Sequence, residues 1–243
     1  MMKQCRFVVF FLLLFLVARG EEKPFPFTNS LGMQFVEVPG TQVLFSVYET
    51  RVKDFIQFAE AENRDWPQPS FPQGKSHPAV NISWEDAKNF CSWLTLLETE
   101  KGYLPEGWRY RLPTEKEWMS AVTDQPFFED EPGFNPELKF PWGDSWPPPK
   151  NAGNYSPELH IEDFPKTAPV GSFLPNVYGI HDMGGNVWEW CEDFFEGARD
   201  IRVLKGGSYN MREVTDILIT TKIGNVSYIR LPAYGFRVVV EKQ

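Results

Sequence analysis

The chain has 243 residues, of which 42% are hydrophobic and 23% charged, and 33 acidic against 24 basic residues give a net charge of −9. This composition excludes a disordered, collagen-like or multi-span membrane protein, because enough apolar surface is present to bury a sizeable core. The acidic balance argues against a nucleic-acid partner, which requires a basic surface. Aromatic residues reach 16%, and 21 Pro and 18 Gly indicate many turns and few long helices.

The first twenty residues have the pattern of a secretory signal. Lys3 and Arg6 precede an uninterrupted apolar run over residues 7–18, and Gly20 follows. The run is shorter than the roughly 20 apolar residues that a membrane-spanning helix needs. We therefore expect residues 1–20 to be a signal peptide and residues 21–243 to form a secreted or periplasmic domain without a stable membrane span. The alternative is an uncleaved N-terminal anchor.

Two cysteines, Cys91 and Cys191, remain after the signal is removed. In an oxidising compartment they could form one disulfide. Both lie among aromatic residues, and a free cysteine is often simply buried. The sequence favours two buried thiols and leaves the disulfide open.

The first half of the mature chain carries strand and helix signals. Residues 33–43 alternate loosely around Pro39 and Gly40, which predicts strand, turn and strand. Apolar residues at helical spacing predict a helix over residues 50–61. Ser83 can cap a second helix that Gly102 ends. Thr114 and Glu117 form a capping box for a third.

Helix signals stop after Val122. Short buried strands are predicted at Val203–Leu204 and over residues 236–240. Helices followed by loops and short strands indicate an α+β domain. The acidic run over residues 127–131 is expected to be a solvated loop.

A series of short motifs then identifies a family resemblance. Together they resemble the formylglycine-generating enzyme family, whose domains are also called sulfatase-modifying factor domains. The resemblance covers about residues 32–240 and implies a C-type-lectin-like fold with two main helices, a small distorted sheet and much irregular loop. In chain order the motifs are Gly32–Gly40, Pro78–Ala87, Tyr110–Trp118, Pro141–Gly143, Thr167–Gly171, Asp182–Trp190, Lys205–Tyr209 and Gly235–Arg237.

The segment from Asp182 to Glu189 has a carboxylate at each end and two glycines between them. Calcium takes about six to eight oxygen ligands, from carboxylates and backbone carbonyls. The resemblance implies a calcium site formed by the side chains of Asp182 and Glu189 with the carbonyls of Gly185 and Val187. Without the family match, a turn acid and a solvated or paired carboxylate would be the simpler interpretation.

The resemblance implies a second calcium site, formed by residues that precede Asp182 in the chain. Its ligands would be the side chain of Asn154, the carbonyl of Tyr155, Glu162 or Asp163, and the carbonyl of Phe164. The register between Glu162 and Asp163 stays open.

The copper chemistry of the family is not expected here. The family enzyme oxidises a sulfatase cysteine with O₂ at two cysteines that hold copper, just after the Gly-Gly-Ser-aromatic motif. At those positions this chain has Met211 and Asp216. A thioether is a weak ligand for Cu(I), a carboxylate is a hard one, and neither is a redox thiol. We therefore expect no catalytic residues, no copper and no formylglycine formation.

Trp188, Ser208, Tyr209 and Met211 correspond to positions around the family's cleft. They predict a groove that binds a secreted or envelope protein, a peptide or a glycan, although Trp188 can equally be a core residue. Arg237 is expected to pair with a buried carboxylate. Two other functions stay open: an oxidoreductase that modifies a sulfatase or another secreted protein without the thiol pair, and a purely structural envelope component.

Overall fold

The computed structural model describes residues 27–124, 139–161 and 163–243. The predicted signal peptide, the acidic run over residues 127–131 and Glu162 lie outside these residues. Three α-helices accompany nine short strands in the described part of the chain. None of these helices is long and apolar enough to cross a membrane.

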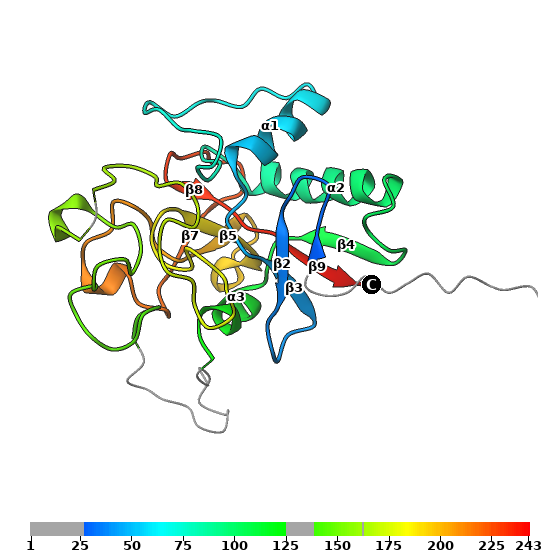
Figure 1. Ribbon diagram of the computed structural model, residues 1–243. Coiled ribbons are helices and arrows are strands. Elements are labelled where there is room, and N and C mark those ends of the chain that lie inside the picture. The colour runs from blue at the N-terminus through cyan, green and yellow to red at the C-terminus, as the bar shows by residue number, and fades with distance from the viewer. Residues whose placement is uncertain (1–26, 125–138, 162) are drawn as a thin grey trace, which may run out of the picture.

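The strands form two sheets in the middle of the molecule (Figure 1). In the first sheet the order is β1-β2-β3-β9-β4, and every pair is antiparallel. In the second sheet the order is β7-β6-β5-β8, with β5 and β8 parallel. The first sheet comprises β1 (Phe27–Thr28), β2 (Gln34–Glu37), β3 (Val43–Ser46), β4 (Trp108–Arg111) and β9 (Val239–Lys242), and the second β5 (Trp188–Phe194), β6 (Ile201–Lys205), β7 (Lys222–Val226) and β8 (Tyr234–Gly235).

The three predicted helices are confirmed as α1 (Val52–Ala61), α2 (Trp84–Glu100) and α3 (Glu115–Val122). The hydroxyl of Ser83 accepts from the N–H of Asp86 at 3.0 Å, and that of Thr114 accepts from the N–H of Glu117 at 3.2 Å. The capping box predicted for α3 is confirmed, and the predicted cap Ser83 of α2 proves to be part of a capping box with Asp86 as well. The predicted first strand of residues 33–43 is β2 and the predicted turn lies at Pro39 and Gly40, whereas the second strand, β3, begins only at Val43 and continues to Ser46.

Two apolar cores lie on opposite sides of the strands. Trp190 and Leu204 pack with the residues of α1 and α2, whereas their chain neighbours Cys191 and Val203 pack with those of α3. This alternation arises because successive side chains of a strand point to opposite faces. Both faces are covered by helices: in Figure 1, α1 and α2 lie above the strands and α3 below them.

The predicted strand over residues 236–240 is corrected by the structure. Tyr234 and Gly235 form β8 in the second sheet, and Val239 begins β9 in the first sheet. Phe236, Arg237 and Val238 lie between these strands, where the chain crosses from one sheet to the other. The sequence resembles that of a buried strand because the side chains of all three residues are buried. The side chain of Arg237, however, bonds to Glu189 rather than packing in an apolar core.

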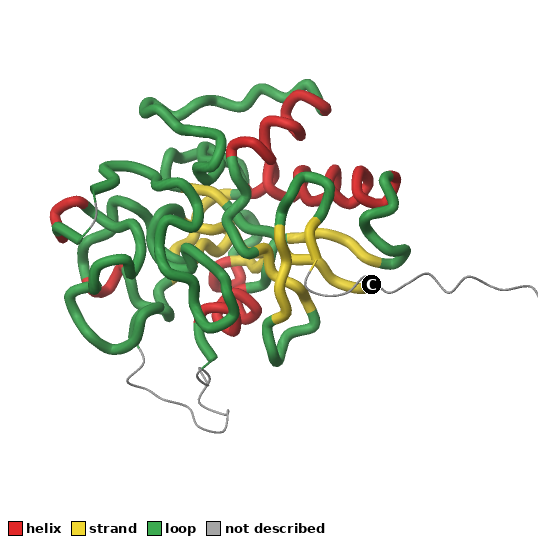
Figure 2. Tube along the Cα trace, viewed as in Figure 1, coloured by secondary structure: helices red, strands yellow, loops and turns green. Residues whose placement is uncertain are grey.

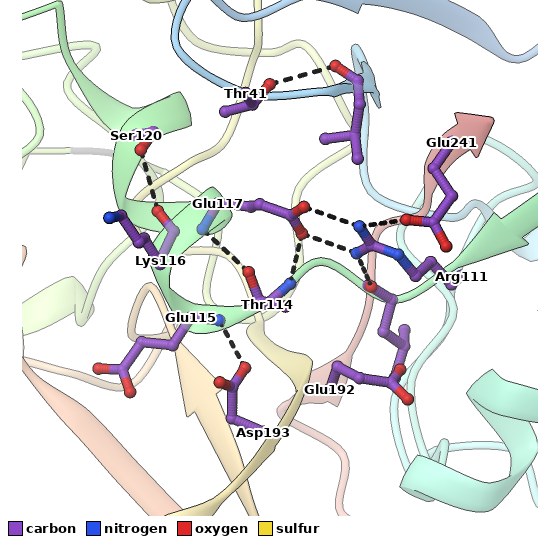
Figure 3. Close-up of polar contacts among 12 residues, drawn as sticks. Thr41, Arg111, Thr114, Glu115, Lys116, Glu117, Ser120, Glu192, Asp193 and Glu241 are labelled. Carbon is purple, nitrogen blue, oxygen red and sulfur yellow. Dashed lines mark hydrogen bonds and ion pairs between the residues drawn. The ribbon is translucent and has the colours of Figure 1, made fainter. Parts of the chain in front are cut away.

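The first turn of α3 is held by polar contacts to β4 and β5 (Figure 3). Arg111 of β4 pairs with Glu117 at 2.7 Å and with Glu241 of β9 at 2.7 Å. The N–H of Glu115 donates to Asp193 of β5 at 2.6 Å. These contacts fix α3 against both sheets and so determine the position of its buried Trp118.

Loops make up the remaining part of the molecule (Figure 2). Between residues 139 and 187, the described segments contain only the short 3₁₀ helix Pro157–Leu159 and one isolated bridge, Phe140 to Gly143. This part carries the positions at which the sequence predicts calcium, except Glu189, which lies in β5.

Candidate functional site

Asn186 is the polar centre of the loop that follows Asp182. Its side chain is 0% exposed and donates to Glu49 Oε2 at 2.8 Å. Its amide oxygen accepts from the N–H of Ala168 at 2.9 Å and from Asn154 Nδ2 at 3.2 Å. One buried amide therefore joins four segments that are far apart in the sequence.

The two predicted calcium loops are in direct backbone contact. The N–H of Asn186 donates to the carbonyl of Asn154 at 2.7 Å. A Cβ atom at Gly185 would lie 2.5 Å from that same carbonyl oxygen, and Gly185 has a φ of 83°. Only glycine allows this approach and this backbone conformation. The family motif predicted the two loops, but no signal in it showed that they touch.

Glu189 forms the buried ion pair predicted for Arg237. Arg237 Nη2 lies 2.7 Å from Glu189 Oε1, and Arg237 Nε lies 2.7 Å from Oε2. Trp118 Nε1 also donates to Oε2 at 2.8 Å. The ionic partner of Arg237 is thus Glu189, which the family resemblance presents as a calcium ligand.

Only one of the two carboxylate oxygens of Asp182 has a hydrogen-bond partner. It has a φ of 59°, and its Oδ2 accepts from the N–H of Gly171 at 2.7 Å, while Oδ1 is buried and has no partner. Burial, opposed by the Gly171 hydrogen bond and by Arg237, raises the pKa of Asp182 to about 6. A carboxylate oxygen in this state is available to a cation.

Glu49 is a third buried carboxylate, and sequence reasoning missed it. It lies just before α1, is 1% exposed, and has an Oε1 atom without a partner. Burial, followed by the charges of Asp182 and Glu189, raises the pKa of Glu49 well above its usual value. No spacing pattern connects Glu49 to Asp182, because the two residues lie 133 positions apart in the chain.

The second predicted calcium loop is incomplete within the described residues. Asn154 and Tyr155 are buried, and both Asn154 Oδ1 and the Tyr155 hydroxyl lack a partner. Asp163 is exposed. It borders a cavity of about 620 Å³ that Pro165 also lines. The choice between Glu162 and Asp163 stays open, because Glu162 is not among these residues.

Metal ligands are therefore present as scattered oxygens. Among the described residues, no group of three or more His, Cys, Asp or Glu side chains could hold a metal ion. Unpartnered side-chain oxygens nevertheless belong to Glu49 and Asn154, which both bond to Asn186, and to Asp182, which lies four positions before Asn186 in the same loop. These oxygens fit a hard cation that completes its shell with backbone carbonyls.

The two positions of the family's copper cysteines, Met211 and Asp216, both have atoms close to Gly207. A Cβ atom at Gly207 would be 3.6 Å from Met211 Cγ and 3.4 Å from the Asp216 carbonyl oxygen. Met211 also packs against two apolar clusters, one containing Trp188 and the other Tyr155. The residues present do not fit copper, because neither a thioether in an apolar contact nor a carboxylate replaces a thiolate pair.

The predicted cleft residues are mostly buried. Trp188, Ser208 and Tyr209 are 3%, 0% and 4% exposed, and the Ser208 hydroxyl donates to Asn210 Oδ1 at 2.6 Å. Tyr209 packs edge-on against Phe71. Of the four residues, only Met211 is partly exposed.

The two remaining cysteines are buried thiols of the apolar cores. Cys91 and Cys191 are both free and buried, Cys91 in the core beneath α1 and α2 and Cys191 in the core beneath α3. Burial raises the pKa of the Cys91 thiol to about 12 and that of the Cys191 thiol well above its usual value. Both are inert at neutral pH, because the thiolate is the reactive form.

The family follows from comparison with known sequences. Residues 23–242 match the Sulfatase-modifying factor enzyme 1-like domain, so the chain belongs to this family. It is 31% identical over 206 residues to the bovine protein named Inactive C-alpha-formylglycine-generating enzyme 2, covering 77% of this chain and 60% of the relative. It is 29% identical over 208 residues to the Formylglycine-generating enzyme of Thermomonospora curvata, covering 72% and 59%.

Solved structures confirm the predicted α+β, C-type-lectin-like fold class. PvdO from Pseudomonas aeruginosa superimposes with a TM-score of 0.61 at 21% identity, covering 82% of this chain and 80% of that one. Treponema denticola variable protein 1 superimposes with a TM-score of 0.65 at 18% identity, covering 90% and 100%. At these identities the likeness concerns the fold alone. The chain spans about 60% of the length of the curated relatives named above.

Proposed function

We propose that this chain is a secreted, calcium-supported domain of the formylglycine-generating enzyme type that lacks the copper oxidase activity and acts as a binding or structural module. The observation that carries the proposal is the pair Met211 and Asp216 beside Gly207, where the family places its thiols. Relatives named as active and as inactive enzymes are similarly distant from this chain, so their names alone do not decide the activity.

A binding role is supported by the architecture. The loop-built part of the molecule adjoins two sheets whose central strands pack into two apolar cores, and such a scaffold presents variable loops without needing chemistry. The partner class is a secreted or envelope protein, a peptide or a glycan. Nucleic acid is not proposed, because the chain has nine more acidic than basic residues.

Copper binding and turnover test the loss of oxidase activity. The purified chain is loaded anaerobically with Cu(I) and incubated in air with a sulfatase-type cysteine peptide. We expect no stoichiometric copper and no aldehyde by mass spectrometry. The double variant Met211→Cys, Asp216→Cys is the matched control: it should bind one Cu(I) tightly, because it restores the thiol pair at the same backbone positions. Stoichiometric copper and aldehyde formation by the unaltered chain would overturn the proposal.

Calcium is proposed as a ligand of the native state, at the two segments that the family resemblance implies, residues 182–189 and residues 154–164. A ligand that binds only the folded chain stabilises it by mass action. Thermal unfolding followed by circular dichroism should therefore show a higher Tm in millimolar calcium than in EDTA, with magnesium as the ionic-strength control. Equal melting temperatures in calcium and EDTA would remove the calcium part of the proposal.

Secretion is proposed from the first twenty residues. Expression of the full chain in a secreting host, followed by intact-mass measurement, should give a product that begins at Glu21. A membrane-bound product that retains residues 1–20 would favour the anchor instead.

A further inference from the structure

Tyr209, one of the predicted groove residues, is covered by side chains from other segments. It is 4% exposed. The ring of Phe71 packs edge-on against the Tyr209 ring, with 5.8 Å between the two centroids. Lys166 Nζ lies 5.2 Å from the centroid of the Tyr209 ring and 5.9 Å from that of the Phe71 ring. A ligand that touches the Tyr209 ring at this position must therefore take the place of Phe71.

Phe71 belongs to residues 67–73, a segment without helix or strand that follows α1 at the outer edge of the molecule (Figure 1). Within the described part of the chain, no backbone-to-backbone hydrogen bond holds this segment. Its contacts to other segments are made by side chains, such as Asn81 Nδ2, which donates to the carbonyl of Pro67 at 3.1 Å. A segment with few backbone hydrogen bonds opens at a low cost in free energy. Prolines, which stiffen a chain and have no N–H to donate, stand at Pro67, Pro69 and Pro72.

The chain is anchored on both sides of this segment. Before it, Trp66 Nε1 donates to the carbonyl of Val80 at 2.8 Å, and the Trp66 ring packs against the core beneath α1 and α2. After it, the N–H of Lys53 in α1 donates to the carbonyl of Lys75 at 3.0 Å. A movement of residues 67–73 therefore leaves both ends of the segment in place.

One side chain at the end of the segment holds it closed. Gln73 Nε2 donates to the hydroxyl of Thr167 at 2.9 Å. The receiving loop is itself fixed, because the buried side chains of Asn154 and Asn186 bond to the backbone on either side of Thr167. Phe71 and Gln73 thus close on a fixed surface, and the segment is the part that moves.

Resting on the binding role proposed above, we propose that the position of Phe71 against Tyr209 is a docking site for an aromatic side chain of a partner peptide, and that residues 67–73 are its built-in competitor. The ring of the chain's own Phe71 shows the chemistry that this position accepts. An edge-to-face ring pair and an ammonium group near both rings, that of Lys166, favour an aromatic side chain over an aliphatic one. A partner binds in the fraction of molecules in which residues 67–73 have moved away.

This competition determines the sign of the expected effect. A site that is open in only a fraction of the molecules binds its ligand with an affinity reduced by that fraction. Removing the Phe71 ring should therefore tighten the binding of an aromatic peptide at this position. If Phe71 were a permanent wall of the groove, its removal would weaken binding or leave it unchanged.

The probe for the test is the segment itself, as the free peptide acetyl-Pro-Gln-Pro-Ser-Phe-Pro-Gln-amide. The chain is labelled with fluorotyrosine, and the fluorine NMR signal of Tyr209 is assigned as the one that is lost in Tyr209→Phe. We expect the peptide to shift this signal in Phe71→Ala with a Kd at least about tenfold lower than in the unaltered chain. The same peptide with alanine in place of its phenylalanine should not shift the signal.

The matched control is Phe194→Ala. It also removes an aromatic ring in contact with a cation, because the guanidinium of Arg202 lies 3.5 Å from the centroid of the Phe194 ring. Its peptide affinity should equal that of the unaltered chain. The signal of Tyr110, which is 3% exposed in the core beneath α1 and α2, should keep its position in all variants and so reports an intact fold.

A second variant keeps the Phe71 ring and removes only the side chain that holds the segment closed. Gln73→Ala loses the hydrogen bond to Thr167, so residues 67–73 should be displaced more often. The Kd of the free peptide should then fall by about two- to tenfold. A permanent wall at Phe71 would leave the Kd of this variant unchanged.

Equal peptide affinities in the unaltered chain, Phe71→Ala and Gln73→Ala would overturn the proposal, as would a Tyr209 signal that the peptide shifts in none of them. Tighter binding to the unaltered chain than to Phe71→Ala would overturn it too, because Phe71 would then be part of the groove. These results are independent of the copper test. Aldehyde formation in that test would overturn the proposed function and leave the ratio of peptide affinities unchanged.

Discussion

Different kinds of contact stabilise the helix-covered part of the molecule and its loop-built part. Beneath α1 and α2, the rings of Phe55, Phe90 and Phe236 lie 5.4 to 6.2 Å apart in one continuous apolar core. In the loops around Asp182, the buried contacts are hydrogen bonds and ion pairs made by Asn186 and Glu189. An apolar core tolerates changes that conserve volume. A polar network requires particular atoms at particular places.

The largest loss of stability is expected from removing the buried guanidinium group of Arg237. Arg237→Met leaves three buried carboxylates without a positive partner, and breaking a buried pair costs about 3–5 kcal/mol. Urea unfolding should therefore show a loss of this size in the free energy of unfolding. The matched control is Arg109→Met, because Arg109 pairs with Glu241 at 2.6 Å but is 49% exposed, and its loss should cost no more than about 1 kcal/mol. Equal losses in the two variants would contradict the distinction between buried and surface pairs.

An isosteric change sharpens the comparison. Asn186→Asp replaces the Nδ2 donor to Glu49 with an oxygen and adds a fourth carboxylate to the three already present. Each buried hydrogen bond that is left unpaired costs about 1–3 kcal/mol, so we expect a loss of roughly 3 kcal/mol by urea unfolding. In the helix-covered core, the volume-conserving Leu94→Met should cost less than about 1.5 kcal/mol, although Leu94 is also 0% exposed. A tolerated Asn186→Asp would show that the network is not required for folding.

The same contrast explains what could be predicted from the sequence. α2 and α3 were predicted with their caps because Ser83 and Thr114 signal a helix start within four residues, and apolar spacing reports which face is buried. The order of the family motifs predicted the fold class. Local signals of this kind depend only on neighbours in the chain.

The site could be predicted only in part. Asp182 and Asn154 were found through the family motif, and Arg237 was expected to have a buried carboxylate partner. Glu49 was missed, because it lies 133 positions before Asp182 and follows no motif spacing. Residues 236–238 were read as strand, because the apolar pattern is the same whether the chain stays in one sheet or crosses to another. Contacts between distant segments leave no periodic trace in the sequence.

The smallest expected change in stability concerns Lys205, a buried amine without a close ionic partner. Lys205 of β6 is 0% exposed, donates to the carbonyl of Ile219 at 2.9 Å, and lies 3.8 Å from the nearest carboxylate oxygen, on Glu115. Burial, partly opposed by the charge of Glu115, lowers the pKa of Lys205 to about 8 from an ordinary value of 10.5. Arg237, with two oxygens of Glu189 at 2.7 Å, shows how a close partner changes this balance: its pKa is raised.

The pH dependence of stability follows from this shift. Between pH 8 and 10.5 the unfolded chain holds more protons at Lys205 than the folded chain, so the contribution of Lys205 to stability rises with pH. The free energy of unfolding of the wild type should rise relative to that of Lys205→Met by about 1–2 kcal/mol from pH 8 to 9.5. The buried thiols of Cys91 and Cys191 act in the opposite direction, but they are present in both proteins and cancel in the difference. Leu204→Ala, at a buried neighbour that does not titrate, should give an offset that is constant with pH. Parallel curves for the wild type and Lys205→Met would show that the Lys205 amine stays charged in the folded chain, held by Glu115 as Arg237 is held by Glu189.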